Sequence, residues 1–323
     1  MSRAVVCAEY GPPEVVRVQQ HPVTAAGTGQ VGVRVQVAAV NFPDVLLVAD
    51  SYQISIPTPF VPGSEFAGIV DELGPQTTGF ALGDRVTGAG MSGAFAERVV
   101  VDAASLALIP DGVDTVAAAA SGVAHRTAYH TLRSVARLRA GDELVVLGAG
   151  GGVGLAAVQL GVALGARVTA VASSTEKLDA AADHGAARTI NHRLGDLRSA
   201  LRDAVPHGAD VVVDPVGGEL SEPALRGLRR GGRFVTVGFA SGGIPRIPLN
   251  LVLIKGIQVL GFQFQDVPPT EFARNESELR DLLVSGRVTP HIDTVYPLAE
   301  AAKALRHVAD GRAIGKVLID PRT

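Results

Sequence analysis

The stretch that most constrains the fold is a glycine-rich turn at residues 147–155, which reads LGAGGGVGL. It closes an apolar strand, ELVVLG, and opens an apolar helical stretch, VGLAAVQLGVALGA. The spacing of Ala149, Gly151 and Gly154 matches the A-x-G-x-x-G form of the dinucleotide-binding fingerprint. Gly151 would let the backbone approach a pyrophosphate, Gly154 would let the helix pack closely, and the helix N-terminus would attract phosphate. The register of strand, turn and helix favours a dinucleotide site over a merely flexible turn.

Apolar strands alternate with helical stretches through the middle of the chain. The predicted strands are ELVVLG (143–148), RVTAVA (167–172), ARTIN (187–191), DVVVDPVG (210–217), GRFVTVGF (232–239) and IQVLGF (257–262). Six strands joined by crossovers predict an α/β unit with a doubly wound parallel sheet. The alanine-rich segment before them, from about residue 115, is predicted to be helical.

The first third of the chain alternates apolar and polar residues in steps of two. In QVGVRVQVAAVN, Val31, Val33, Val35 and Val37 share one face of a predicted half-buried strand. Further short strands are predicted in EVVRVQQ, FAGIVDELG, DRVTG and AFAERVVVDA, and a last one in GKVLID near the C-terminus. This region is therefore predicted to form a compact, mostly β domain.

Composition narrows the possible partners. The length of 323 residues suits two domains, and a net charge of −3 provides no basic face for nucleic acid. No apolar run approaches the roughly 20 residues that span a bilayer, and the first residues lack a secretory signal's apolar core. The single cysteine, Cys7, allows no internal disulfide. We expect a cytoplasmic protein in which Cys7 is buried as a small apolar residue.

The segment after the second predicted strand indicates which dinucleotide is bound. An NAD-binding unit usually places an acid about 20 residues beyond the fingerprint, where it bonds the ribose 2′-hydroxyl. Here the segment reads SSTEKL, beginning at Ser173 and including Lys177. Hydroxyls and an ammonium suit a 2′-phosphate, which a carboxylate would repel. We predict NADP(H), although the Ser-Ser-Thr run also suits a plain helix N-cap and Glu176 is a carboxylate close by.

The order and spacing of several motifs make the whole chain resemble the zinc-independent quinone oxidoreductases of the medium-chain dehydrogenase/reductase superfamily. The matching stretches include VNFPDVLL (40–47), PFVPGSEFAGIVDELG (59–74), GGVGLAAVQL (151–160) and DPVGG (214–218). The resemblance implies a Rossmann NADPH-binding domain at 123–262, inserted in a GroES-like, mostly β catalytic domain at 1–122 and 263–323. It also implies a cofactor cleft between the domains and a homodimer that pairs edge strands near IQVLGF.

The resemblance further assigns the cofactor contacts, and at one of them this chain departs from the family, which often has tyrosine where His192 stands. The implied contacts are Asn41 and Thr127 at the nicotinamide end; Gly151, Gly152 and Val153 at the pyrophosphate; Ser173, Lys177 and His192 at the 2′-phosphate; Phe239, Ala240 and Ser241 at the nicotinamide ribose; and Phe262 or Phe264 from the loop after the sixth strand.

The zinc-dependent relatives carry a cysteine and a histidine at positions held here by Asn41 and Ser64. We therefore predict no metal site. A second departure is His125 and Arg126, which precede Thr127 where the family usually has small or apolar residues. Either could line a cleft for a polar or acidic substrate, but we expect both to be solvated at a helix start.

Without a metal to polarise the acceptor, the substrate must already be a good hydride acceptor. The sequence predicts an NADPH:quinone oxidoreductase, acting by one- or two-electron reduction, or alternatively an NADPH-dependent reductase of enones, 2-alkenals or enoyl thioesters. Asn41 could donate to the developing oxyanion. Tyr52 is the candidate proton donor, although packing on the cleft rim explains it equally well and solvent could supply the proton.

A role outside catalysis is the remaining alternative. Relatives of this family are reported as crystallins or RNA-binding proteins, and such a protein would hold NADPH as a structural ligand. The sequence has no basic stripe interleaved with aromatic residues, which speaks against RNA. We expect a small-molecule acceptor as the partner and no nucleic acid or membrane.

Overall fold

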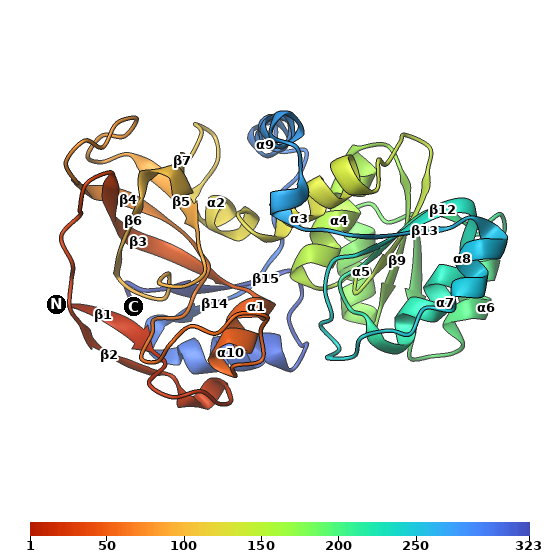
Figure 1. Ribbon diagram of the computed structural model, residues 1–323, viewed down its shortest axis with the longest axis horizontal. Helices are drawn as coiled ribbons and strands as arrows, with labels where there is room; N and C mark the ends of the chain where they lie inside the picture. The colour runs from red at the N-terminus through yellow and green to blue at the C-terminus, as the bar shows by residue number, and fades with distance from the viewer. The chain divides into compact units, whose positions relative to one another are not determined.

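The computed structural model describes all 323 residues, and the chain divides into two compact units. The terminal unit combines the two chain ends, Met1–Val123 and Pro290–Thr323. The inserted unit is the continuous segment Ala124–Thr289. In Figure 1 the inserted unit runs from the yellow of α3 through green and cyan to the blue of α9, and the terminal unit carries the red to orange start and the violet-blue end of the chain.

The inserted unit is built on a six-stranded sheet in the order β10-β9-β8-β11-β12-β13, in which all neighbours are parallel. Its strands are β8 (Glu143–Leu147), β9 (Arg167–Ala172), β10 (Arg188–Asn191), β11 (Ala209–Asp214), β12 (Leu228–Thr236) and β13 (Gln258–Gly261). Its helices are α3 (Ala124–His130), α4 (Gly152–Ala163), α5 (Thr175–Asp183), α6 (Leu197–Ala204), α7 (Ser221–Arg226), α8 (Leu249–Lys255) and α9 (Pro269–Val284). Each strand overlaps a predicted one, although β12 begins four residues earlier than predicted and β11 ends three residues earlier, and the doubly wound sheet is confirmed.

Burial explains why these strands are continuous apolar runs. In the central strand β8, the residues from Leu144 to Leu147 are almost completely buried, as expected when helices cover both faces of a parallel sheet. The helices flanking the sheet are visible in Figure 1. Because all strands are parallel, their carboxyl ends share one edge of the sheet, where ligands of open α/β folds bind.

The terminal unit is mostly β, as predicted. Its main sheet has the order β14-β15-β3-β4-β5-β7, with β6 also paired to β3, and β1 and β2 form a separate ribbon. Its strands are β1 (Ser2–Val6), β2 (Arg17–His21), β3 (Gln30–Val40), β4 (Glu65–Leu73), β5 (Arg85–Ala89), β6 (Arg98–Asp102), β7 (Leu106–Leu108), β14 (Ile292–Pro297) and β15 (Lys316–Asp320). Its helices are α1 (Phe42–Val48), α2 (Thr115–Ser121) and α10 (Ala301–Ala309).

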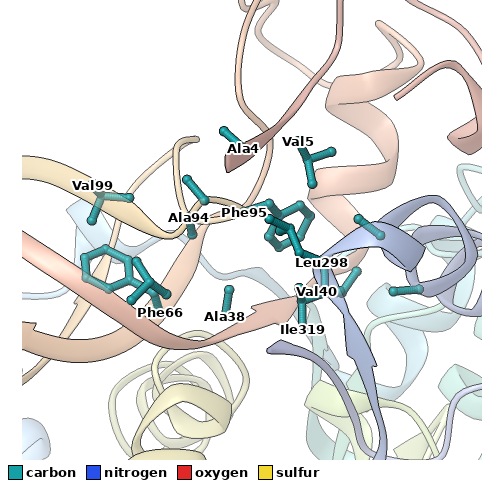
Figure 2. Packing of buried hydrophobic residues seen from close by; sticks show 14 of the residues in the cluster. Ala4, Val5, Ala38, Val40, Phe66, Ala94, Phe95, Val99, Leu298 and Ile319 are labelled. Carbon is teal, nitrogen blue, oxygen red and sulfur yellow. The ribbon is translucent and has the colours of Figure 1, made fainter. Parts of the chain in front are cut away.

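The core of the terminal unit joins the two ends of the chain. Strand β15 pairs antiparallel with β3, and this places Ile319 opposite Ala38 in the core that Figure 2 shows. Leu298, which precedes α10, packs into the same cluster as Phe95 from the first part of the chain. The C-terminal segment therefore completes the sheet that the N-terminal segment begins.

The division of the chain differs from the predicted boundary at residue 263. Residues 263–289 group with the inserted unit, because α9 packs against α3. The fully buried His130 lies with Nε2 2.8 Å from Glu276 Oε1, and the Nδ2 of buried Asn275 lies 3.0 Å from its Nδ1. These contacts fasten α9 to the first helix of the unit, so the second part of the terminal unit begins only at Pro290.

Two expectations from composition can be compared with the fold. Cys7 is buried, as predicted, and its thiol donates a hydrogen bond to the Glu9 carbonyl at 3.2 Å. None of the helices combines the length and the apolar character needed to cross a lipid bilayer.

Candidate functional site

The glycine-rich turn connects β8 to α4 and is shaped for close backbone approach. A Cβ atom on Gly154 would lie 2.0 Å from the Gly148 carbonyl oxygen, so the first turn of α4 rests directly on the end of the strand. A Cβ on Gly151 would approach only that same oxygen, at 3.6 Å, which leaves the face above Gly151 open. No side chain caps α4. The open face and the uncapped N–H groups suit the pyrophosphate of a dinucleotide.

Lys177 lies against this turn. A Cβ on Gly150 would lie 2.5 Å from the Cβ and Cγ atoms of Lys177, so the lysine stem crosses the glycine directly. Ser174 is the N-cap of α5 and accepts a hydrogen bond from the Lys177 N–H at 3.4 Å. Its hydroxyl also bonds the Glu176 carboxylate and lowers the pKa of that group. The helix-cap interpretation of this segment is therefore correct for Ser174, while half-buried Ser173 lies at the end of β9.

The loops after the neighbouring strands meet at the same edge of the sheet. His192 follows β10, and its N–H donates to the Ala172 carbonyl at the end of β9, at 3.1 Å. After β12, the N–H groups of Ala240 and Ser241 donate to the carbonyls of Pro215 and Val216, at 3.2 and 2.9 Å. Exposed Phe239 opens this loop. The structure thus gathers the predicted pyrophosphate, 2′-phosphate and ribose contacts of this unit along the carboxyl edge of its sheet.

The aromatic residues after β13 lie near α3. Phe262 is buried, and its ring centroid is 4.9 Å from that of Phe264. Phe264 lies in turn 5.7 Å from the His130 ring, centroid to centroid, with the Arg126 guanidinium 5.5 Å above it. These rings anchor the loop to α3, the helix that also carries the predicted nicotinamide contact Thr127.

The expectation that His125 and Arg126 are solvated is wrong. His125 is only 2% exposed, and Arg126 is half-buried with its Nε 2.9 Å from Glu276 Oε1. Arg126 lies in the contact between α3 and α9, because Glu276 of α9 pairs with its guanidinium. A charged side chain that is partly buried requires a partner, and for Arg126 this partner comes from α9, which the resemblance placed in the other domain.

Asn41 lies in the terminal unit, at the N-cap of α1, inside a buried polar cluster. Its N–H donates to Asp44 Oδ2 at 2.7 Å, in a capping box. Its Nδ2 donates to Glu65 Oε1 at 2.9 Å and to Ser64 Oγ at 3.1 Å, while its Oδ1 accepts from Lys316 Nζ at 2.7 Å. The amide is thus oriented from both ends. Donation to a substrate oxyanion would require it to exchange one of these partners.

Glu65 and Lys316 complete the cluster as a buried ion pair. Glu65 opens β4 and Lys316 opens β15, and their side chains are 0% and 4% exposed. Asp44 is also fully buried, and burial raises the pKa of its carboxyl to about 7. Sequence reasoning missed all three. The signal that could have found Glu65 and Lys316 is a charged residue at the start of an otherwise apolar strand.

The buried polar cluster includes the two positions, Asn41 and Ser64, at which zinc-dependent relatives carry metal ligands. Asn41 and Ser64 provide an amide and a hydroxyl, which are poor ligands for zinc compared with thiolate or imidazole. No group of three or more His, Cys, Asp or Glu side chains is placed to hold an ion. Tyr52, the other candidate catalytic residue, belongs to this unit too and packs, partly buried, against its apolar core.

Comparisons with known proteins agree with this architecture. The model of the alcohol dehydrogenase GroES-like domain matches residues 27–111, and that of the zinc-binding dehydrogenase matches residues 152–281. The chain is 37% identical to the Bos taurus quinone oxidoreductase-like protein 2, covering 98% of this chain and 92% of that protein.

Two further relatives extend the similarity. The human synaptic vesicle membrane protein VAT-1 homolog is 30% identical, over 99% of this chain and 86% of that protein. The Escherichia coli quinone oxidoreductase, solved in complex with NADPH, is 27% identical with a TM-score of 0.92, over 99% of this chain and 100% of that one. Fold, motifs and overall similarity together place the chain among the oxidoreductases: it belongs to the quinone oxidoreductase family of the medium-chain dehydrogenase/reductase superfamily.

Proposed function

We propose that the chain is a metal-independent NADPH:quinone oxidoreductase. The observation that carries the NADPH assignment is the stem of Lys177, which crosses Gly150 in the fingerprint turn, with no acid at the expected position. The related Escherichia coli quinone oxidoreductase was solved in complex with NADPH, and this supports the same cofactor for the present chain. The GroES-like terminal unit, with its amide and hydroxyl in place of metal ligands, supports a reaction that needs no Lewis acid.

Bound NADPH supplies the hydride, and the residues of the chain hold and orient it. Gly151, Gly152 and Val153 would hold the pyrophosphate, and Ser173, Lys177 and His192 would hold the 2′-phosphate. The segment from Phe239 to Ser241 would contact the nicotinamide ribose, and the loop after β13 would add a contact from Phe262 or Phe264. Thr127, on α3 of the same unit, would contact the nicotinamide end.

The acceptor is a quinone because quinones take up a hydride without electrophilic assistance. The product oxygen needs a proton, which Tyr52 or solvent supplies. Asn41, fixed by Lys316 and Glu65, presents an amide of defined orientation beside the Ser64 hydroxyl. An enone or enal is the second candidate acceptor, because the same amide could bond its carbonyl oxygen.

The deciding experiment follows NADPH oxidation with an ortho-quinone, anaerobically and with a chelator present. We expect turnover that the chelator does not reduce, and a large preference for NADPH over NADH. Loss of activity with the chelator would overturn metal independence. Turnover of 2-alkenals without turnover of quinones would move the assignment to an unsaturated-carbonyl reductase.

A second copy of the chain is the proposed protein partner. Strand β13 is an edge of its sheet, and Val259 on it is 43% exposed. Helix α8, which precedes β13 in the chain, also leaves the side chains of Leu249, Leu253 and Ile254 exposed. Pairing of the β13 edges of two copies would satisfy the open backbone groups of both strands, and exposed apolar side chains nearby favour such an interface. The substitution Val259→Lys should convert a dimer to a monomer in light scattering, whereas Val284→Lys, at an exposed site on α9, should not.

A further inference from the structure

Arg126 lies beside residues of the inserted unit that the proposed function places at the nicotinamide. It directly precedes Thr127 on α3, and its guanidinium carbon is 5.5 Å from the centroid of the Phe264 ring, in the loop after β13. The ring centroid of Phe272, on α9, is 5.6 Å from the same carbon. A hydride acceptor has to lie against the nicotinamide. Arg126 therefore borders the place that the proposed function gives to the acceptor.

The Arg126 guanidinium is held at one nitrogen, and its other two nitrogens are unoccupied. Its Nε donates to Glu276 Oε1 at 2.9 Å, and this is the only hydrogen bond that the guanidinium makes within the protein. The side chain is 30% exposed. Arg133, which is 29% exposed, instead donates from both Nε and Nη2 to Glu278, at 3.0 and 3.1 Å. Of these two equally exposed arginines, Arg126 keeps both Nη groups for an acceptor outside the chain.

The groups behind Arg126 carry a single negative charge. Burial would raise the pKa of Glu276, but hydrogen bonds from His130 and Arg126 outweigh this effect and lower it. The Arg274 guanidinium donates to Asn275 Oδ1 at 2.8 Å, which orients the amide. Asn275 Nδ2 then donates to His130 Nδ1 at 3.0 Å, so the imidazole is uncharged and donates from Nε2 to Glu276. Arg126 and Glu276 therefore form a neutral pair, and any selectivity for an anion must arise from direct bonds to the Nη groups.

We propose that Arg126 binds an anionic substituent of the acceptor, so that the preferred substrates are quinones that carry a carboxylate or a similar acidic group. The inference rests on the proposed quinone reductase function and adds Arg126 as its specificity-determining residue. The planar fork of Nη1 and Nη2 matches the two oxygens of a carboxylate. The bond to Glu276 and the rings of Phe264 and Phe272 hold this fork in place before the substrate arrives.

The test compares two acceptors, 1,2-naphthoquinone and 1,2-naphthoquinone-4-sulfonate, which differ by one anionic group. The value of kcat/KM is measured for each at saturating NADPH. We expect Arg126→Gln to lower the value for the sulfonate about tenfold, because a charge-assisted hydrogen bond is lost, and to leave that for the neutral quinone nearly unchanged. Each variant is compared with wild type on the same quinone, so the different intrinsic reactivities of the two quinones cancel. Arg133→Gln is the matched control and should leave the preference between the quinones unchanged.

The substitution Glu276→Gln distinguishes recognition by Arg126 from a structural role of the pair. Both hydrogen bonds to Glu276 end on Oε1, and a glutamine oxygen can accept them equally, so only the negative charge is lost. We expect this variant to raise kcat/KM for the sulfonate relative to the neutral quinone, the opposite of Arg126→Gln. A structural pair would instead lower the values for both quinones in both variants, and that result overturns the inference alone. Turnover of neither quinone by the wild-type chain overturns the proposed function and the inference with it.

Discussion

Lys316 Nζ lies 2.6 Å from Glu65 Oε1, and both side chains are almost completely enclosed. The ammonium also bonds the Asn41 oxygen at 2.7 Å, while Glu65 accepts from the Asn41 amide nitrogen at 2.9 Å. Glu65 Oε2 further accepts from the Val123 N–H at 2.6 Å. The pair therefore satisfies its own charges and fixes the amide that the proposed reaction uses.

Removal of one partner of this pair should be strongly destabilising. Lys316→Met leaves the Glu65 carboxylate buried without its counter-charge, and we expect the free energy of unfolding to fall by about 3–5 kcal/mol in urea titrations. The control is Lys303→Met, whose exposed pair with Glu300 should contribute at most about 1 kcal/mol. Equal effects of the two substitutions would contradict the structural role assigned to Lys316.

Asp44 should make stability depend on pH. Burial raises the pKa of its carboxyl to about 7 in the folded state, against about 4 in the unfolded chain. The folded state therefore binds this proton more tightly, and the contribution is present below about pH 4 and lost as the pH rises to about 7. Asn does not ionise, so Asp44→Asn should not lose stability in this way. The free energy of unfolding of the variant, measured relative to wild type, should therefore increase as the pH rises from about 4 to about 7. Asp111→Asn, at an exposed site, is the control.

The glycines of the fingerprint turn should respond differently to a methyl group. Gly154→Ala places Cβ against the Gly148 carbonyl oxygen, so we expect α4 to shift and thermal stability to fall markedly. Gly151→Ala meets no such obstacle and has an ordinary φ of −84°, but its methyl fills the open face. It should keep the melting temperature and lose NADPH affinity. A variant pair with the opposite pattern would exclude this site for the pyrophosphate.

Lys177 should discriminate between the two cofactors. We expect Lys177→Ala to raise the KM for NADPH by roughly 10- to 100-fold, because a charge-assisted bond to the 2′-phosphate is lost. The KM for NADH should hardly change. Steady-state kinetics with both cofactors measure the ratio, and Lys303→Ala, on the terminal unit, serves as control. Parallel losses with NADPH and NADH would indicate that the lysine supports the turn rather than the phosphate.

The substitution Tyr52→Phe distinguishes a role of Tyr52 in proton donation from a role in packing. Tyr52→Phe keeps the ring, which packs against the core of the terminal unit, and removes only the hydroxyl. If the hydroxyl supplies the proton, kcat should fall by about 10²-fold or more with little change in stability. An unchanged kcat would show that Tyr52 is not the proton donor, which would then be solvent, and that the tyrosine serves in packing.

The elements with strong periodicity could be predicted from the sequence. The six strands of the parallel sheet are continuous apolar runs, because helices cover both faces of the sheet. The glycine spacing between β8 and α4, which follows a strand and opens a helix, predicts the fingerprint turn directly. The buried face of β3 also follows from alternation, although register shifts after Gly32 and Val35 bend the strand. Such local patterns require no knowledge of distant residues.

The polar clusters could not be predicted because they depend on contacts between distant segments. Lys316 meets Glu65 across 251 positions of sequence, and His130 meets Glu276 across 146. A lysine in GKVLID or a histidine in TAYHTL has an ordinary local context, and only the folded chain supplies its partner. The same holds for α9, whose sequence does not reveal which unit it covers.

The position of β15 between β14 and β3 has a consequence for biosynthesis. The inserted unit is one continuous segment and can fold as soon as residues 124–289 have been synthesised. The first 123 residues cannot complete their fold until β15 and Lys316 have been synthesised, because their sheet lacks a strand and Glu65 lacks its counter-charge. A nascent chain paused before residue 290 should therefore be competent for nucleotide capture and yet remain a client for chaperones.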